Sequence, residues 1–412
     1  MLLYYKIKNF KTFNKEIEVD LIADMHIKKF ISNTIQTNDR NVLKAIGVYG
    51  PNNTGKSCLI EAIYALKVIM LNEPHLPFYN SFYNDTVTEI EAIYEVNNQI
   101  YKYIVKYDSL NKKYLYEKLD RLSTGKSNNF TSLNLLLRSD EKKDIKIKSM
   151  KNIPVNLLND NIPFFMLFSL NNTELEEDRN NYIKFAKSIS FVNASGLLDI
   201  SKTIDILQND EKGKKFITSF AKNCDLNIED FGYSNDINSD INISNELSEY
   251  QSNKEFLKVW SKHHGYVVPS VFFDSLGTRK LIALAGYIYK SLIDGGILLI
   301  DEIDSSLHHV IIRAIISLFN NELNQKTQLI FSTHDALTMD LRRLFRKDQI
   351  YLTNINEEKE NELIHFSSKF TSRDENGSRG NEEVFDYYLK GRFGSIPSPD
   401  LFDTMYEVLK DE

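Results

Sequence analysis

Cysteine is nearly absent from this chain of 412 residues, which contains only Cys58 and Cys224. Two cysteines provide neither a disulfide framework nor a cysteine zinc site, and they favour a reducing compartment. Long apolar runs are also lacking, because Lys290 and Asp294 interrupt the most apolar stretch, Leu281–Ile300. A membrane span needs about 18 or more such residues, so we expect none. The first ten residues lack the apolar core of a signal peptide, and we expect a cytoplasmic protein.

A strong excess of one charge sign is missing as well. The 50 lysines and arginines stand against 57 aspartates and glutamates, which gives a formal net charge of −7. This balance argues against a surface that is basic all over, but it leaves room for a local basic groove. The hydrophobic content of 42%, with 12% aromatic residues, is enough to bury a sizeable core. At about 150 residues per domain, the length predicts two or three lobes.

The hydrophobic pattern divides the chain into three predicted regions. Residues 1–122 alternate between short strands and one helix and form the first half of an α/β head. Residues 123–265 are rich in Asn, Asp, Lys and Ser, and we predict an inserted, mostly helical arm or lid. Residues 266–412 return to alternating helices and strands, which is typical of a parallel sheet, and form the second half of the head.

Individual elements follow from the same pattern. We predict strands at Leu2–Ile7, Glu16–Ile22, Val42–Tyr49, Ile297–Ile300 and Gln328–Ser332, and an antiparallel meander over Val87–Leu122. Helices are expected after Ser57 up to Leu71, near Tyr182–Ile189, and at Ile204–Phe220, Asp274–Lys290 and Val310–Leu323. The very polar stretch Asn235–Asn253 is expected to be a loop.

A glycine-rich octet, Gly50–Ser57, lies between a predicted strand and a predicted helix. Its spacing is G-x-x-x-x-G-K-S, in which the backbone wraps phosphate oxygens at a helix N-terminus. The candidate nucleotide-binding residues are Gly50, Asn52, Asn53, Thr54, Gly55, Lys56 and Ser57. Lys56 is expected to reach the β and γ phosphates and to act in catalysis, and Ser57 to supply a hydroxyl to Mg²⁺. The alternative is a chance octet, which the flanking strand and helix disfavour.

Two later strands end in polar side chains of the kind that a magnesium-dependent ATPase needs. Asp301 and Glu302 follow a buried strand, so Asp301 is the candidate metal ligand and Glu302 the candidate group that polarises the attacking water. His334 follows the next strand and is a candidate sensor of the γ phosphate. The alternatives are a solvated acidic turn and an ordinary histidine. Both alternatives are disfavoured because the same chain contains a phosphate loop.

A third segment, Ser275–Arg279, precedes a predicted helix and combines a hydroxyl, a glycine and a helix N-terminus. That combination favours an anion, with Ser275 and Gly277 as the candidate contacts. Taken alone it is more typical of a plain helix N-cap.

In chain order these motifs resemble the head of ABC-type ATPases, including the SMC-like ones. The phosphate loop, signature (Ser275–Arg279), metal-binding strand, D-loop (Ile303–His308) and switch histidine (Phe331–Asp335) all have counterparts. Asn9-Phe10-Lys11, the run Asp301–His308, Asp348–Tyr351 and Leu389–Pro397 resemble the AbiLi, RloA and overcoming-lysogenisation-defect ATPases. These act mostly in bacterial defence against phage. The resemblance covers about Met1–Leu122 and Val267–Pro397.

The resemblance implies a P-loop head with a mixed sheet and an antiparallel meander, with ATP and Mg²⁺ as cofactors. It further implies a head-to-tail homodimer or higher oligomer, in which Ser275 and Gly277 of one subunit cap the γ phosphate held by Lys56 of the other. The signature lacks the second glycine and the glutamine of transporters, and His308 stands where their D-loop has aspartate. The glutamine that couples ATP to the lid is not identified. The 78 residues after His334 are too few for a further nuclease domain, so we expect the effector to be a separate protein.

The sequence leaves three functions open. The first is an ATP-driven switch that regulates a separate effector, such as a nuclease, in anti-phage defence. The second is a DNA-repair or SMC-like ATPase that clamps nucleic acid, for which Lys142–Lys151 and Leu341–Lys347 are candidate basic clusters. The third is a small-molecule kinase, which requires an acceptor pocket. Composition neither shows nor excludes a nucleic-acid partner, and no membrane partner is expected.

Overall fold

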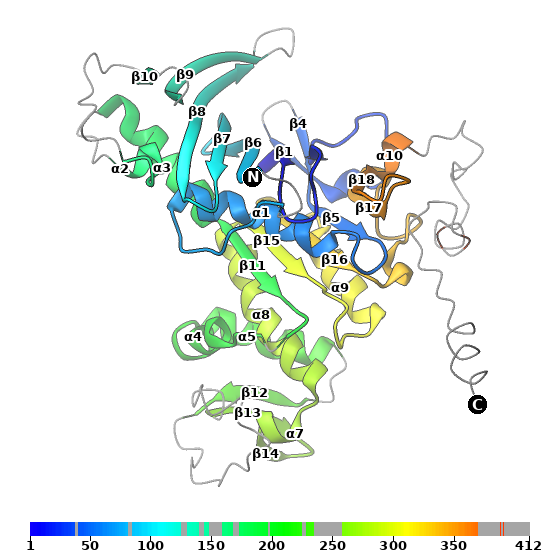
Figure 1. The fold of residues 1–412 in the computed structure, drawn as a ribbon. Coiled ribbons are helices and arrows are strands. Elements are labelled where there is room, and N and C mark those ends of the chain that lie inside the picture. Colours follow the sequence, from blue (N-terminus) through cyan, green and yellow to red (C-terminus); the bar gives the residue numbers. More distant parts are fainter. Residues whose placement is uncertain are drawn as a thin grey trace, which may run out of the picture.

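The computed structural model describes residues 1–37, 40–80, 85–124, 130–139, 144–147, 159–167, 173–196, 198–224, 228–234, 258–369, 388 and 390. Two large sheets with a helix layer between them form the body of the molecule, and further helices cover the outer face of one sheet (Figure 1). The predicted α/β fold with a mixed sheet and an antiparallel meander is confirmed. Asn235–Asn253, most of the basic cluster Lys142–Lys151 and nearly all of Leu389–Pro397 lie outside the described residues.

The first sheet is antiparallel and has seven strands in the order β10-β9-β8-β7-β6-β1-β2. Its strands are β1 (Leu2–Lys8), β2 (Ile17–Asp20), β6 (Val87–Val96), β7 (Gln99–Asp108), β8 (Lys113–Thr124), β9 (Phe130–Ser139) and β10 (Asp144–Ile147). Buried and half-exposed residues alternate along β6 and β7, as expected where one face of a sheet meets the core. The predicted meander over Val87–Leu122 is therefore confirmed, and it continues into β9 and β10.

The second sheet has six strands in the order β11-β15-β16-β5-β17-β18. Its strands are β5 (Ala45–Tyr49), β11 (Ile189–Asn193), β15 (Gly296–Asp301), β16 (Thr327–Thr333), β17 (Ile350–Ile355) and β18 (Asn361–His365). All pairings are parallel except that of β17 with β18. Every residue of β5 and β16 is buried, as expected for central strands of a parallel sheet that is covered on both faces.

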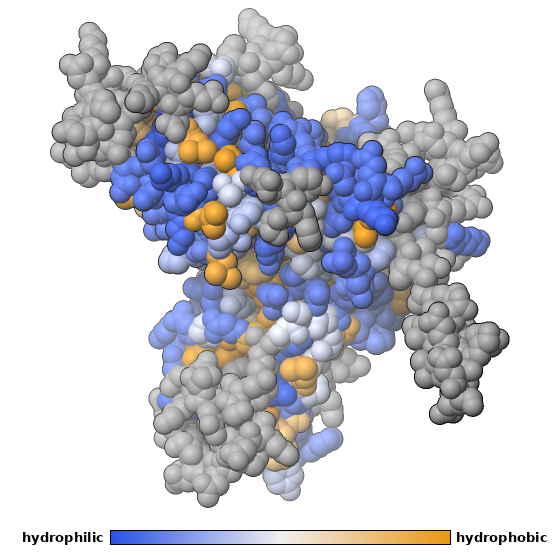
Figure 2. All heavy atoms as spheres, in the orientation of Figure 1, coloured by the Kyte–Doolittle hydropathy of each residue, from blue (hydrophilic) through white to orange (hydrophobic). Residues whose placement is uncertain are grey.

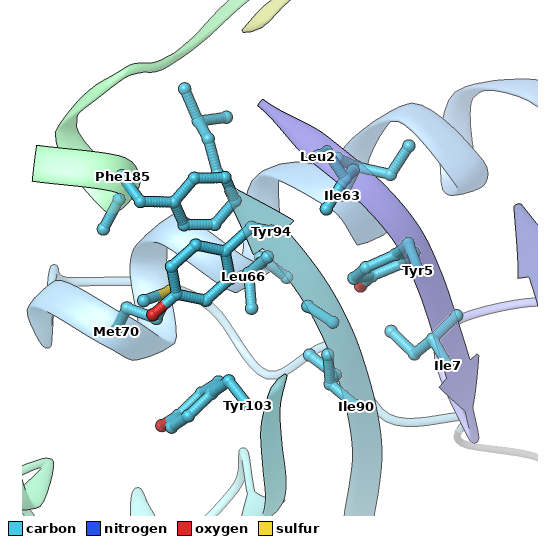
Figure 3. Close-up of a cluster of buried hydrophobic side chains, with 14 of the residues drawn as sticks. Leu2, Tyr5, Ile7, Ile63, Leu66, Met70, Ile90, Tyr94, Tyr103 and Phe185 are labelled. Atoms are coloured by element: carbon cyan, nitrogen blue, oxygen red, sulfur yellow. The ribbon is translucent and has the colours of Figure 1, made fainter. Parts of the chain in front are cut away.

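The helix layer between the sheets consists of α1 (Lys56–Leu71) and α3 (Thr173–Lys187). Figure 3 shows Leu66 and Met70 of α1 beside Tyr94 of β6, together with Phe185 of α3. The rings of Tyr94 and Phe185 stack with their centroids 3.9 Å apart. This aromatic packing joins α3 to the antiparallel sheet. The Tyr114 hydroxyl of β8 donates to the Ile69 carbonyl of α1 (2.6 Å), and α1 begins at the phosphate loop.

The outer face of the parallel sheet is covered by α4 (Ser201–Asn209), α5 (Glu211–Asn223), α8 (Leu276–Asp294) and α9 (His309–Phe319), which share one buried core with it. A three-stranded sheet lies beyond them in Figure 1: β12 (Asp230–Tyr233), β13 (Val259–His263) and β14 (Tyr266–Pro269), followed by α7 (Ser270–Phe273). The remaining elements are β3 (Thr34–Thr37), β4 (Arg40–Leu43), α2 (Phe164–Leu167), α10 (Phe366–Lys369) and the 3₁₀ helices η1 (Ile31–Asn33), η5 (Ala336–Thr338) and η6 (Lys347–Gln349).

Two predicted elements are divided in the structure. The single strand expected at Val42–Tyr49 is split at Lys44 into β4 and β5, which belong to different sheets. Lys44 is 1% exposed, and its ammonium donates to the carbonyl oxygens of Ser32 and Asn321. The helix expected at Ile204–Phe220 is split at Asp210, whose carboxylate caps α5.

The predicted boundaries of the inserted arm do not coincide with the ends of the two sheets. The boundary at residue 122 lies inside β8, and β9 and β10 extend the same antiparallel sheet. In addition, β11 pairs in parallel with β15 and so belongs to the head. The polar composition of the surrounding stretch hid these strands from the sequence pattern. The division into three regions remains a prediction.

No helix within the described parts of the chain is long and apolar enough to cross a membrane. On the face shown in Figure 2, most of the surface is hydrophilic and hydrophobic residues form only small separate groups.

Candidate nucleotide site

The phosphate loop connects β5 to α1, as its sequence predicts, and its shape requires both glycines. Gly50 has φ of 152°, and a side chain there would collide with the backbone and hydroxyl of Thr353. Gly55 is the N-cap of α1 with φ of 100°, and a side chain would meet the ring of Phe13. Positive φ is readily adopted by glycine, so the loop can place its N–H groups around an anion at the start of α1.

Within this loop, Thr54 is structural and Lys56 is the charged group. The Thr54 hydroxyl donates to the Pro51 carbonyl (2.8 Å) and contacts the Thr353 hydroxyl (2.6 Å), which anchors the loop to β17. Asn52 and Asn53 are exposed, and Ser57 is half-buried. The Lys56 ammonium donates to the carbonyls of Gly50 (2.9 Å) and Pro51 (2.6 Å).

The environment of Lys56 favours an anionic ligand. Lys56 is 5% exposed, and burial lowers the pKa of its ammonium to about 8. The carboxylates of Asp304, Glu302 and Asp301 act in the opposite direction, though less strongly. A phosphate placed next to this ammonium would replace the lost solvation and favour the charged form.

Asp301 and Glu302 lie at the carboxyl end of β15, held by a serine from the neighbouring strand. The Ser332 hydroxyl donates to the Asp301 carboxylate and accepts from the backbone N–H of Glu302 (2.8 Å). Glu302 has φ of 52°, a left-handed conformation that costs a non-glycine residue about 1–2 kcal/mol. Ser332 therefore links the candidate metal ligand to the candidate base, and together with the packing around the strand end it fixes the turn between them.

His334 lies at the carboxyl end of β16, between β15 and the phosphate-loop strand β5. Its backbone N–H donates to the Asp304 carboxylate (3.1 Å). Burial lowers the pKa of the imidazole, and the positive charge of Lys56 lowers it further. The ring is therefore neutral at pH 7 and can offer one donor and one acceptor to a phosphate or a water.

These residues meet in one pocket of about 430 Å³ (lining: Thr12, Asn52, Asn53, Gly55, Lys56, Ser57, Cys58, Glu302 and His334). The structure thus places the loop, Glu302 and His334 together, although they come from segments about 250 residues apart in sequence. The Thr12 hydroxyl is buried and has no hydrogen-bond partner, so a ligand could satisfy it.

The donor set suits Mg²⁺ better than a transition metal. Ser57 and Asp301 are hard oxygen donors, and Mg²⁺ in phosphate sites takes one or two protein oxygens beside phosphate and water. Among the described residues there is no cluster of three or more His, Cys, Asp or Glu side chains that could hold a metal by themselves. The loop and these two oxygens therefore fit a magnesium-bound nucleotide.

Segment Ser275–Arg279, predicted to be the signature, lies outside this pocket. Ser275 is the exposed N-cap of α8, and its hydroxyl accepts from the Thr278 N–H (3.1 Å). A β-carbon at Gly277 would stand 2.5 Å from the carbonyl oxygen of Ser306 in the D-loop. Neither Ser275 nor Gly277 lines the pocket that contains Lys56.

A buried lysine connects the signature helix to the loops around the site. Lys280 of α8 is 3% exposed, and its ammonium donates to the Ser305 hydroxyl (2.9 Å) and to the Ala194 carbonyl (2.7 Å). The Ala194 N–H in turn donates to the carbonyl of Asp301. The signature helix, the D-loop and the end of β11 are thereby joined next to the metal-binding strand.

Sequence reasoning missed three residues that the structure brings to this region. Thr12 directly follows the segment Asn9-Phe10-Lys11 but belongs to no motif itself. Ser332 lies in an apolar run, where a hydroxyl gives no periodic signal. Asn193 ends β11 and is the register partner of Asp301. Its amide oxygen accepts from the backbone N–H (2.9 Å) and the hydroxyl (2.6 Å) of Ser195, and only the pairing of β11 with β15 locates it beside Asp301.

Residues 46–340 match the family described as "AAA domain, putative AbiEii toxin, Type IV TA system". The match covers more than two thirds of the chain. The chain belongs to this family. No curated protein matches the sequence.

Solved structures of SMC heads are similar at low sequence identity. The SMC head domain from Thermotoga maritima is 13% identical, with a TM-score of 0.42, and the match covers 88% of this chain and 98% of that chain. The SMC head bound to the C-winged helix domain of ScpA is 12% identical, with a TM-score of 0.46, and the match covers 89% of this chain and 98% of that chain.

Proposed function

We propose that this protein binds ATP with Mg²⁺ in the phosphate-loop pocket and hydrolyses it to ADP and phosphate. The observation that carries the proposal is the convergence of Lys56, Ser57, Glu302 and His334 on one pocket, with Asp301 directly before Glu302. A P-loop ATPase needs these parts together: a phosphate cradle, an oxygen ligand for the metal, and a group that orients water. Membership of an AAA family supports the same chemistry.

Each of these residues has a role in ATP binding or hydrolysis. The backbone of Gly50–Ser57 and the Lys56 ammonium bind the β and γ phosphates, while Ser57 and Asp301 hold the magnesium ion. When bound, that ion neutralises charge that develops on the phosphates. Glu302 accepts a hydrogen bond from the attacking water and aligns it with the γ phosphate, and His334 contacts the γ phosphate from the next strand.

We further propose that the site is completed by a second copy of the chain, in an ABC-type head-to-tail dimer. Ser275 and Gly277 lie outside the pocket of their own protomer, and Ser275 is exposed at the N-terminus of a helix of 19 residues. A helix N-terminus with free N–H groups suits the γ phosphate of a partner's nucleotide. Lys280 and the D-loop link this helix end to the protomer's own site, so each site would sense the other.

At the level of biology, we propose a regulatory switch for a separate effector protein, such as a nuclease, in anti-phage defence. The family's description names a putative toxin of a type IV TA system, and a toxin–antitoxin pair has a second component that a switch could regulate. ATP can drive a switch only if the open and closed dimers bind it with different affinities. Direct clamping of nucleic acid is the weaker alternative for the 341–347 cluster, because Arg346 is buried in an ion pair with Asp348 (2.8 Å).

The hydrolysis proposal is tested with purified wild-type protein and Glu302→Gln. We expect the wild type to release phosphate from ATP only with Mg²⁺, with ADP as the other product. Glu302→Gln should bind ATP as tightly but turn over at least about 100-fold more slowly, because it lacks the carboxylate that orients water. Calorimetry measures the binding, and phosphate release measures the rate.

The matched control is Glu322→Gln, which removes one exposed carboxylate on the loop after α9 and should keep the wild-type rate. Wild-type turnover by Glu302→Gln would refute the assignment of the base. Transfer of the γ phosphate to an added acceptor in place of water would indicate a kinase.

A further inference from the structure

A second cavity, larger than the phosphate-loop pocket, lies at the amino ends of strands β11 and β15 of the parallel sheet. Its volume is about 650 Å³, against about 430 Å³ for the phosphate-loop pocket. Ser188 and Ser190 at the amino end of β11 line it, as does Gly295 just before β15. The phosphate loop, Glu302 and His334 follow the carboxyl ends of their strands. The two cavities are therefore separate sites on the same sheet.

Four lysines from three helices converge on this cavity. Lys184 and Lys187 come from α3, Lys202 from α4 and Lys290 from α8. Figure 1 shows α3 and α4 on one side of the molecule, with α8 and β11 beside them. In a chain with a net charge of −7, this concentration of positive charge in a concave site stands out from the average surface.

The lysines outnumber the two carboxylates of the lining, Asp205 and Asp294. Within the described residues, no ion pair joins Lys187, Lys202 or Lys290 to an acidic side chain, and the Lys184 ammonium donates to the neutral amide oxygen of Asn97 (2.8 Å). Lys202 lies over the ring of Tyr287, 4.2 Å from its centroid. A cation–π contact of this kind holds the ammonium in place and keeps its charge.

The charges are close enough to repel one another. Burial lowers the pKa of Lys202, and the positive charges of Lys67 and Lys290 lower it further, against the opposite effect of Asp199. Like charges held together destabilise the unliganded protein, and an anion in the cavity removes that repulsion. The fold needs no such cluster for its core, since the buried residues of α3, α4 and α8 are largely apolar.

We propose that this cavity binds a small molecule that carries two or more phosphate groups together with hydroxyl or amino groups. The four lysines supply point charges for phosphates. The carboxylates of Asp205 and Asp294, also in the lining, accept hydrogen bonds from neutral parts of the ligand. A phosphorylated nucleoside has this chemistry.

Two features favour a small molecule over a nucleic-acid strand. The volume lies within the range of about 300–1,000 Å³ that is typical of small-molecule sites. The two carboxylates in the lining would repel a backbone that crosses it with a phosphate at every step. A compact ligand can turn its phosphates to the lysines and its uncharged end to the carboxylates.

The test uses the full chain with Lys56→Ala, which disables the phosphate loop, and sodium tripolyphosphate as the probe in a calorimeter. We expect one binding event, weakened at least about tenfold by adding Lys187→Gln and Lys290→Gln. The control adds Lys214→Gln and Lys215→Gln instead, which removes the same charge from exposed positions of α5 and should leave the affinity unchanged. Melting temperatures of all three proteins establish that each is folded.

The outcomes separate the alternatives. Loss of tripolyphosphate binding in the cavity variant but not in the control supports the site. Equal affinity in both variants, or no binding in the Lys56→Ala parent, overturns it. An eight-nucleotide oligothymidylate that binds at the cavity lysines more tightly than tripolyphosphate also overturns the proposal, because it identifies a nucleic-acid surface. None of these results depends on whether the protein hydrolyses ATP.

Discussion

Lys56 is held in a setting that makes its charge sensitive to the ligand. It is buried, it donates to two carbonyl oxygens of its own loop, and burial lowers the pKa of its ammonium to about 8. Bound phosphate would favour the protonated form, so that the pKa in the complex is higher than in the free protein. The proton affinity of one side chain therefore reports on the proposed site.

This difference predicts proton uptake on ATP binding near pH 8. Below the free pKa the lysine is already protonated, and binding takes up no proton there. Between the free pKa and the higher pKa of the complex, binding takes up a proton and the affinity falls as pH rises, by up to tenfold per pH unit. Calorimetry at pH 8.5 in buffers of different ionisation enthalpy measures the uptake.

Lys56→Gln is the control for this measurement, since it retains hydrogen-bond donors but cannot take up the proton. His334 does not confuse the result, because its pKa is lowered from 6.5 and it is neutral throughout this range. Wild-type binding without proton uptake at pH 8.5 would show that Lys56 does not meet the phosphates.

Of the individual site residues, the sequence predicted those that belong to short motifs of consecutive residues. Gly50–Ser57, Asp301, Glu302 and His334 each lie in a short pattern that follows a buried strand, and the structure brings them to the same edge of the sheet. Ser332 and Asn193 could not be predicted in this way. Their importance comes from strand pairing, since Ser332 reaches Asp301 from β16 and Asn193 lies opposite Asp301 in register.

Among the elements, α8 is the one whose position the proposed mechanism depends on most. Its N-terminal turn packs directly on the D-loop, because a β-carbon at Gly277 would stand 2.5 Å from the Ser306 carbonyl oxygen. Lys280, one turn further on, bonds the Ser305 hydroxyl from inside the molecule. The signature and the D-loop should therefore move as one unit.

This contact predicts that Gly277→Ala lowers ATP turnover while the protein stays folded. The added methyl group would stand 2.5 Å from the Ser306 carbonyl oxygen, so the helix end or the D-loop must shift. Overpacking of this kind costs about 1–3 kcal/mol, and a misplaced signature should reduce turnover by about tenfold or more. Phosphate release and the melting temperature measure the two effects.

Gly196→Ala is the matched control, because a β-carbon at Gly196 meets no atom within 4 Å. It should leave turnover and melting temperature unchanged. If Gly277→Ala behaves like this control, the packing of α8 on the D-loop is not needed for activity.

The secondary structure was predictable where one period of the pattern runs through a whole element. α1, α8 and the meander β6–β8 belong to this class. The pattern failed where tertiary contacts divide an apolar run, as at Lys44 between β4 and β5, and where strands have a mixed composition, as in β9 and β10. It also failed at β11, whose partner β15 lies about 100 residues later in the sequence.

At the scale of the whole molecule, the proposed dimer predicts that two inactive variants can restore activity to each other, because each contributes a different part of a shared site. Ser275→Arg should place a bulky cation where the partner's phosphate is expected, and Lys56→Ala should weaken the phosphate site itself. Each homodimer then has two defective sites. A mixed dimer has one site with both defects and one site with none.

Mixing the two inactive variants should therefore restore about a quarter of the wild-type turnover, if subunits exchange at random and each site works alone. The control is a mixture of Ser275→Arg with the double variant Ser275→Arg/Lys56→Ala, which can form no intact site. Phosphate release is measured after the subunits have equilibrated. Equal activity of the two mixtures would count against sites shared between subunits.

The most direct measurement is a crystal structure of Glu302→Gln with ATP and Mg²⁺. The account predicts the β and γ phosphates inside the Gly50–Ser57 loop beside Lys56, and the magnesium ion between Ser57 and Asp301. Ser275 of a second copy should face the γ phosphate. A nucleotide bound elsewhere, with the loop empty and Asp301 far from the metal, would contradict it.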